Sequence, residues 1–174
     1  MLSLYAPLVS GFVANVNKPV VKDFKYYGDI APTGFFDPLN LSTEKNSKYL
    51  REFELQHGRV AMVSAAIIPL YELMNPGKLG IDFLANMEPD KQLPFWYIMA
   101  LLEFGRMKTG WVNPFTRKRL FTLKSDFQPG NYLGYDAEKV SERLYNTELS
   151  NGRLAMLGAA HMVGSELATG HGLF

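Results

Sequence analysis

Two stretches of the chain carry the same reactive side chains at the same spacing: ELQHGRVAM at residues 54–62 and ELSNGRLAM at residues 148–156. Each begins with a glutamate, has a histidine or asparagine three residues later, and then an arginine. On a helix, a spacing of three leaves two side chains about 60° apart around the axis, so they lie on one face. A carboxylate beside an imidazole or an amide offers single lone pairs to a hard metal such as magnesium.

The arginine of each stretch follows its glutamate by five residues, which places it about 140° away around a helix. Pairing within one helix needs a spacing of three or four, so neither glutamate can readily bond the arginine of its own stretch. We therefore predict that two helices cross and exchange partners, with Glu54 bonded to Arg153 and Glu148 bonded to Arg59. Each glutamate would then be neutralised and would keep a lone pair for a ligand.

Three helix-like segments position these residues, and we expect them at about 43–74, 93–109 and 137–169. Pro69 should kink the first helix without ending it, and Gly170 should end the third. Val and Ile are too sparse, and alternation is too weak, for strands. The sequence predicts an all-α chain that forms a single domain over residues 1–174, with an extended N-terminal segment at about 1–42 and long loops between the helices.

The uncharged run in each helix is short, about 10 to 13 residues against about 20 for a typical membrane span. The charged first turn lengthens the first and third helices sufficiently if glutamate and arginine neutralise each other. With alternating helices, fourteen of the 18 basic residues fall on the side of the N-terminus, and Lys78 and Lys91 fall on the other side. This asymmetry predicts an all-α membrane protein with three transmembrane helices, of which the first and third form a pseudo-symmetric crossed pair.

The second helix offers a further neutralised carboxylate, because Arg106 follows Glu103 by three residues and can pair with it. Single donors without net charge suit a metal that needs one axial ligand, as magnesium in a chlorin ring does. A lone Glu-x-x-His is commonly solvated or structural, but neutralised glutamates on three apolar helices favour ligation. The rival interpretation is a carboxylate-bridged di-iron oxidase, whose bundles use Glu-x-x-His on two helices. The basic residue after each motif argues against it.

The composition excludes several other classes of protein. The chain has no cysteine, so neither disulfides nor thiolate metal sites are available. Lys plus Arg is 18 and Asp plus Glu is 17, and this balance gives no reason to expect nucleic acid as a partner. No opening stretch has the features of a signal peptide, so we expect a processed product.

The two nonamers resemble the Glu-x-x-His/Asn-x-Arg motifs of the light-harvesting chlorophyll-binding protein superfamily, and GFFDPLNLS and FQPGNYLGYD resemble its two carotenoid-seating loops. The resemblance spans about residues 34–170 and implies chlorophylls held around two crossed helices, with no enzymatic activity. By position, the implied chlorophyll ligands are Glu54, His57, Glu103, Glu148 and Asn151. The implied carotenoid-seating residues are Phe36, Asp37 and Pro38 in the first loop and Tyr135 and Asp136 in the second.

The sequence departs from the family pattern in its third helix and second loop. The family usually has a glutamine ligand 14 residues after the asparagine, where this chain has Ser165. His161, one turn earlier, can replace that ligand or serve helix packing, and Glu166 is a weaker substitute. Asp136 is not followed by Pro-Leu, so the second carotenoid can sit differently or be absent. His171 is expected to be an interfacial polar residue rather than a ligand.

Within the family, the chain resembles the red-lineage antennae and their chlorophyll a/b-binding-like branch, RedCAP. This implies an antenna subunit that transfers excitation energy to a photosystem core, with photosystem I favoured. Its cofactors would be chlorophyll a, with chlorophyll c or b as accessory pigment, and carotenoids such as xanthophylls. Its partners would be that core, neighbouring antenna subunits and thylakoid lipids, with the N-terminus on the stromal side of the plastid thylakoid membrane. A photoprotective, quenching member and a purely structural linker stay open as alternatives.

Overall fold

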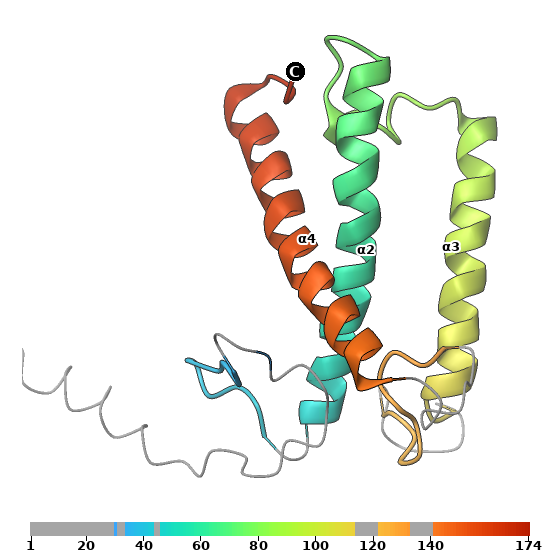
Figure 1. Ribbon diagram of the computed structural model, residues 1–174. Helices are drawn as coiled ribbons and strands as arrows, with labels where there is room; N and C mark the ends of the chain where they lie inside the picture. The colour runs from blue at the N-terminus through green and yellow to red at the C-terminus, as the bar shows by residue number, and fades with distance from the viewer. Residues whose placement is uncertain (1–29, 31–33, 44–45, 114–121, 133–140) are drawn as a thin grey trace, which may run out of the picture.

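The computed structural model describes residues 30, 34–43, 46–113, 122–132 and 141–174, and they form an all-α fold (Figure 1). The long helices are α2 (Ser47–Met74), α3 (Pro89–Gly110) and α4 (Glu142–Thr169), and a short 3-10 helix, η1 (Gly80–Asp82), follows α2. Helices α2 and α4 cross each other, and α3 stands to one side of them. The predicted all-α class with the first and third helices paired is confirmed.

Helix α2 begins later than predicted and continues through its proline as predicted. It starts at Ser47 rather than near Thr43, because Thr43 lies in a turn in which its N–H donates to the Asn46 side-chain oxygen at 2.6 Å. Such side-chain bonds hold the backbone outside the helix. Pro69 lies inside the helix, which continues to Met74.

The other two helices show how far boundaries can be read from apolar patterns. Helix α3 begins at Pro89, four residues before the predicted start at 93, since proline suits the first helical position. The prediction started at the first apolar residue and missed this polar first turn. Helix α4 begins at Glu142, and the expected earlier start falls on 137–140, outside the described residues. Its end at Gly170, in the left-handed region with φ 69°, is as predicted.

Helices α2 and α4 touch at a pair of glycines, one from each nonamer. A Cβ atom placed on Gly58 would lie 3.0 Å from the Cα of Gly152, and one placed on Gly152 would lie 3.1 Å from the Cα of Gly58. Backbone therefore meets backbone, at a separation that would crowd even a Cβ atom. Leu55, Ala61 and Leu149 are buried around this contact and form the apolar core of the pair.

Helix α3 is attached to the other two helices by side chains rather than by close backbone packing. Among the described residues, no Cα atom of α3 lies within 8 Å of one in α2 or α4. Lys124 of the following loop donates through Nζ to the carbonyls of Lys108 (2.8 Å) and Thr109 (2.9 Å), which caps the helix end. The Phe127 ring lies where a Cβ on Gly110 would be, 2.8 Å from its Cζ.

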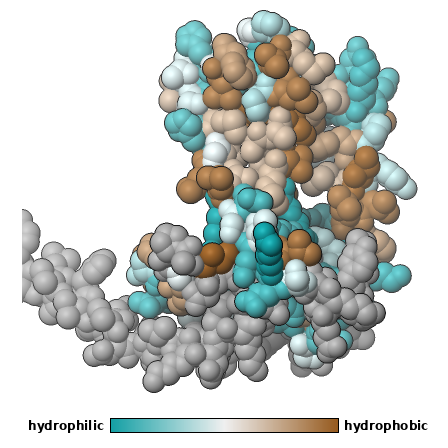
Figure 2. All heavy atoms as spheres, in the orientation of Figure 1, coloured by the Kyte–Doolittle hydropathy of each residue, from teal (hydrophilic) through white to brown (hydrophobic). Residues whose placement is uncertain are grey.

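The outward surfaces of the helices are largely apolar. Large hydrophobic side chains are exposed on all three, including Val63 and Leu70 on α2, Leu101 and Phe104 on α3, and Leu154 and Leu157 on α4. Figure 2 shows hydrophobic side chains gathered over the upper part of the helices and hydrophilic ones where the helices enter the loop layer. Within the described residues, no helix is at once long and apolar enough to cross a membrane.

Candidate functional site

Both crossed ion pairs expected from the sequence are present where α2 and α4 cross. Arg153 Nε lies 2.7 Å from Glu54 Oε1, and Arg59 Nε lies 2.6 Å from Glu148 Oε1. Each carboxylate therefore faces a guanidinium of the other helix. The paired charges cancel, so these glutamates can remain acceptors beside an apolar surface without a net charge.

The two ion pairs are not equivalent, because the first repeat has an additional arginine. Arg51, one turn before Glu54, donates to its Oε2 at 2.8 Å, so Glu54 lies between two guanidinium groups. Arg59 donates through Nη2 to the Gly130 carbonyl at 2.9 Å. No described residue bonds Glu148 Oε2, and this oxygen is therefore available to a ligand.

His57 has the proton arrangement that a metal ligand requires. Its Nδ1 lies 2.8 Å from the Phe53 carbonyl oxygen, which can only accept, so Nδ1 carries the proton. The lone pair is then on Nε2, and the side chain is exposed on α2. Asn151 occupies the equivalent position on α4, is also exposed, and has no hydrogen-bond partner among the described residues. Each repeat thus presents one neutral donor near its glutamate.

Glu103 on α3 belongs to a network that ties α3 to α2. Arg106 donates to its Oε2 through Nε (3.0 Å) and Nη2 (2.6 Å), which is the expected pair within one helix. Gln56 donates to Oε1 at 2.7 Å, and Tyr132 donates to the Gln56 side-chain oxygen at 2.5 Å. Burial, followed by the nearby Glu52 carboxylate, raises the pKa of Tyr132 to about 12, so its hydroxyl remains a donor.

Sequence reasoning missed two buried charges just before the first nonamer, Arg51 and Glu52. Glu52 accepts the Gly130 N–H through Oε2 at 2.8 Å, and its Oε1 lies 3.6 Å from Arg106 Nη1. This carboxylate joins α2, the loop 122–132 and α3 at one point. The sequence did carry a sign of these buried charges, because Arg51 and Glu52 directly precede a motif that is already charged. Two more charges at this position need partners from elsewhere in the chain if they are buried.

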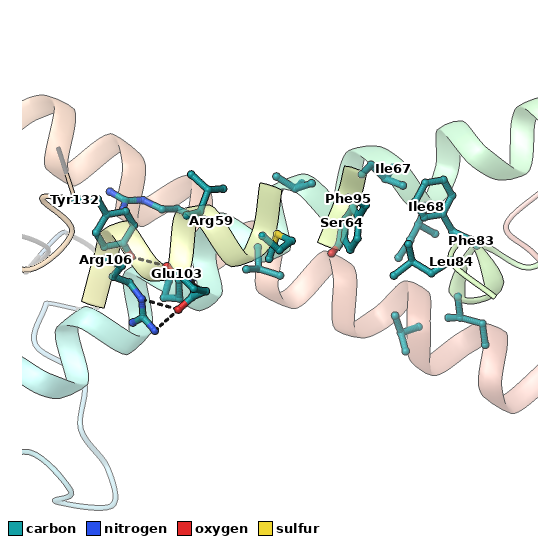
Figure 3. A pocket seen from close by; sticks show the side chains of 18 residues that line it. Arg59, Ser64, Ile67, Ile68, Phe83, Leu84, Phe95, Glu103, Arg106 and Tyr132 are labelled. Atoms are coloured by element: carbon teal, nitrogen blue, oxygen red, sulfur yellow. Dashed lines mark hydrogen bonds and ion pairs between the residues drawn. The ribbon is translucent and has the colours of Figure 1, made fainter. Parts of the chain in front are cut away.

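A cavity of about 650 Å³ lies between α2 and α3 (Figure 3). Four polar residues gather at one end of it: Arg59, Glu103, Arg106 and Tyr132. Apart from Gln56 and Ser64, the remaining walls are apolar and include Ile67, Ile68, Phe83, Leu84 and Phe95. A mostly apolar cavity with a few fixed polar groups is typical of a cofactor site.

The first loop that resembles a carotenoid seat folds around Asp37. Its two carboxylate oxygens accept the N–H groups of Leu41 (3.0 Å) and Ser42 (2.8 Å), which closes a compact turn. A cavity of about 310 Å³ beside this turn is bordered by Phe36 and, on the helix side, by Glu54. The second loop, with Tyr135 and Asp136, lies outside the described residues.

The remaining candidates from the third helix lie apart from the crossed pair. His161 is exposed on α4, and His171 is exposed just after it. Ser165 donates through Oγ to the Met162 carbonyl at 2.8 Å. Glu166 is buried, with 1% of its surface exposed, so the interpretation of this residue as a substitute ligand is wrong.

Glu166 instead lies close to Glu72 at the far end of the helix pair, and both carboxyl groups are buried. Gly80 N–H donates to Glu72 Oε1 at 3.2 Å, and Ile81 N–H donates to Glu166 Oε2 at 3.0 Å. Leu173 N–H donates to Glu72 Oε2 at 2.5 Å, whereas Glu166 Oε1 has no hydrogen-bond partner. Sequence reasoning missed this pair, although Glu72 and Glu166 are separated by the same 94 residues as the two nonamers.

The di-iron alternative is not retained. No three His, Asp or Glu side chains gather around a possible metal position in the part of the chain that the structure describes. The carboxylates of the crossed pair are bonded to arginines, so they cannot bridge two iron ions. The arrangement provides separate single donors instead of one shared metal centre.

Comparison with known proteins assigns the family. Residues 24–167 match the family described as "Chlorophyll A-B binding protein". The chain is 33% identical over 159 residues to the chloroplastic fucoxanthin-chlorophyll a-c binding protein of Isochrysis galbana, covering 82% of this chain and 74% of that protein. It is 30% identical over 176 residues to the chloroplastic light-harvesting complex stress-related protein 1 of Chlamydomonas reinhardtii, covering 86% and 69%. The crossed ion pairs are consistent with this match. The chain belongs to the non-enzymatic, light-harvesting chlorophyll a/b-binding protein family.

Proposed function

We propose that this chain is an antenna subunit that binds chlorophylls and carotenoids in the plastid thylakoid membrane and transfers excitation energy to a photosystem core. The observation that carries this proposal is the pair of atoms at the helix crossing that have no bond among the described residues, His57 Nε2 and Glu148 Oε2. Energy transfer requires pigments at fixed positions and orientations, and it requires no chemical step from the protein.

The donor set fits the magnesium of a chlorophyll, which needs one axial oxygen or nitrogen ligand. We propose five such ligands: Glu54, His57, Glu103, Glu148 and Asn151. The glutamates among them are bonded to arginines, and His57 is oriented by the Phe53 carbonyl behind it. Bound chlorophyll would supply the light absorption, and these residues would fix where each pigment sits.

The cavity between α2 and α3 supports the same proposal. Protein interiors are close-packed, yet α3 makes no close backbone contact with α2 or α4 among the described residues, and about 650 Å³ lies beside it. A planar or elongated apolar pigment would supply the missing packing. The turn at Asp37, with Phe36 and Pro38, would seat the end of a carotenoid beside Glu54.

We propose that the three helices cross the membrane with the N-terminus in the stroma. The exposed apolar side chains on all three helices and the neutralised glutamates support this orientation in lipid. The fourteen basic residues on the N-terminal side, against Lys78 and Lys91 on the other, support its direction.

We further propose a red-lineage antenna, in the RedCAP branch, that carries chlorophyll a, accessory chlorophyll c and xanthophylls. The relative from Isochrysis galbana, named a fucoxanthin-chlorophyll a-c binding protein, supports the pigment assignment. Its partners would be photosystem I, neighbouring antenna subunits and thylakoid lipids.

A photoprotective role is the second candidate, because three relatives that are 30% identical to this chain are named stress-related light-harvesting proteins. The same ligands would serve either role. The excited-state lifetime of the pigment-loaded protein separates them, since a quenching subunit has a short lifetime and a harvesting subunit a long one.

The test is the pigment content of the chain purified in mild detergent from its own membrane. We expect several chlorophylls and at least one carotenoid per chain, with chlorophyll c indicating the red lineage and chlorophyll b contradicting it. His57→Phe should lose one chlorophyll, whereas His171→Phe, which alters an exposed histidine beyond α4, should lose none. A colourless wild-type chain would overturn the proposal and favour a structural linker.

A further inference from the structure

His161 is a polar side chain on an otherwise apolar helix face. It follows Arg153 by eight residues, about 12 Å along α4, and precedes Glu166 by five, about 7.5 Å. Leu154 and Leu157, seven and four residues before it, lie on the same face and are 71% and 72% exposed. In a helix that crosses a membrane, this position lies in the hydrocarbon, where an ionisable side chain needs a partner.

In the part of the chain that the structure describes, this imidazole has no partner. His161 is exposed and has no hydrogen bond or ion pair among the described residues. His57, by contrast, is bonded to the carbonyl four residues before it at 2.8 Å. An unbonded imidazole in hydrocarbon costs free energy, which a ligand that accepts its lone pair would offset.

The helix surface around His161 leaves room for a flat ring. Gly158 and Gly164, three residues before and after it, share its face, and a Cβ placed on either would meet no atom within 4 Å. Ser165, the next residue on this face, has its hydroxyl bonded to the Met162 carbonyl at 2.8 Å. Among the described residues of this face, the imidazole is thus a projecting nitrogen donor beside small residues and the two leucines that precede it.

The packing of the helix pair does not require a histidine here. The equivalent position of the first repeat, 94 residues earlier, is Ile67, which lines the cavity toward α3. The second repeat alone therefore carries a nitrogen donor at this level.

We propose that His161 is the axial ligand of a further chlorophyll, carried on the lipid-facing surface of α4 with its ring over Gly158 and Gly164. This inference rests on the proposed function, since it requires a chain that binds chlorophyll. An imidazole nitrogen suits magnesium that needs one further donor, and Leu154 and Leu157 would pack against the ring.

The test compares the chlorophyll content of wild-type chain, His161→Phe, His161→Gln and Ser165→Ala, each purified with pigments from the same membrane. We expect His161→Phe to lose one chlorophyll per chain, with a matching loss in the red absorption difference spectrum. His161→Gln keeps a possible ligand and should retain that pigment, and Ser165→Ala should match wild type. Full pigment content in His161→Phe would overturn the inference and assign His161 to lipid or a partner protein.

Two further measurements keep the inference falsifiable. If His161→Phe does not assemble, His161→Gly is compared with and without added imidazole, and recovery of one chlorophyll only with imidazole supports ligation. Equal pigment content in both conditions overturns it. A wild-type chain without chlorophyll would instead overturn the proposed function, so the two failures are distinguishable.

Discussion

The two ends of the α2–α4 pair hold the same side chain at equivalent positions in opposite surroundings. Glu72 follows Glu54 by 18 residues, and Glu166 follows Glu148 by 18 residues, which is five helical turns. At the arginine-paired end, Glu54 and Glu148 each face an arginine of the other helix. At the carboxyl end, Glu72 and Glu166 face backbone N–H groups and lie close to each other.

This difference indicates how each end responds to a change of charge. Removing one partner of a buried ion pair is strongly destabilising, because the other charge remains without compensation. A carboxyl group held by backbone N–H groups depends on no other side chain, and a neutral amide of the same shape keeps an acceptor for those bonds. The arginine-paired end should therefore be sensitive to the loss of charge, and the carboxyl end should tolerate it.

The largest effect is expected for Arg59→Leu, which leaves Glu148 without a cation and breaks the bond to the Gly130 carbonyl. We expect a loss of about 2–4 kcal/mol in the free energy of unfolding, somewhat below a fully buried pair because both side chains are 29% exposed. Denaturation of the pigment-loaded protein, followed by visible circular dichroism, measures it. A loss below about 0.5 kcal/mol, the size typical of exposed pairs, would contradict this prediction.

A smaller effect is expected for Arg153→Leu, because Arg51 remains bonded to Glu54 at 2.8 Å. The expected loss is about 1–2 kcal/mol, and the double variant with Arg51→Leu should cost more than the sum of the single variants. The same denaturation experiment applies. If Arg153→Leu is as destabilising as Arg59→Leu, the two repeats are energetically equivalent and the proposed asymmetry is wrong.

Tyr132→Phe separates the effect of hydrogen bonding from the effect of charge at the arginine-paired end. It removes a neutral hydrogen bond and leaves every charge in place. The lost bond to Gln56 should cost about 0.5–1.5 kcal/mol. The pKa of Tyr132 is raised to about 12, so its stabilisation is complete below the ordinary value of 10.0 and disappears as pH rises through 12. Absorbance titration of the phenols should show one late-titrating tyrosine that the variant lacks.

The smallest effect is expected at the carboxyl end, for Glu166→Gln. The amide oxygen can still accept the Ile81 N–H, and the amide nitrogen can donate to Glu72, where Glu166 Oε1 now has no partner. We expect a change below about 1 kcal/mol, in the stabilising direction. Glu148→Gln is the matched control and should be clearly destabilising, since it leaves Arg59 without its counter-charge. Equal losses in both variants would remove the distinction between the two ends.

Much of the site could be predicted because it follows from helix geometry. A spacing of five excludes pairing within a helix, and that rule alone indicated the partners Arg153 for Glu54 and Arg59 for Glu148. The number of helices and the end at Gly170 follow from local patterns of the same kind. The helix number and the helix end depend on residues that are close in sequence, and the ion-pair partners depend on the repeated nonamer.

The rest depends on contacts that local patterns do not encode. The bonds of Gln56 join α2 to Glu103 and Tyr132, and the burial of Glu52 depends on the backbone of Gly130. Each partner becomes a neighbour only once the loop 122–132 has docked. The carboxyl end could not be predicted from the nonamers, because Glu72 and Glu166 lie five helical turns beyond Glu54 and Glu148, where the two repeats share few other residues.

The separation of α3 from the other helices has a consequence for how the protein is made and retained. The crossed pair can form from polypeptide alone, through its glycine contact and ion pairs. Helix α3 is bonded to α2 through side chains, but among the described residues it has no close backbone contact with α2 or α4. We therefore expect a newly synthesised chain to dock α3 last, when pigment becomes available. In a plastid short of chlorophyll, trypsin should cut detergent-solubilised chains near Lys108 and Lys124 far faster than pigment-loaded ones. Pigment supply would then set the cellular lifetime of the chain as well as its colour.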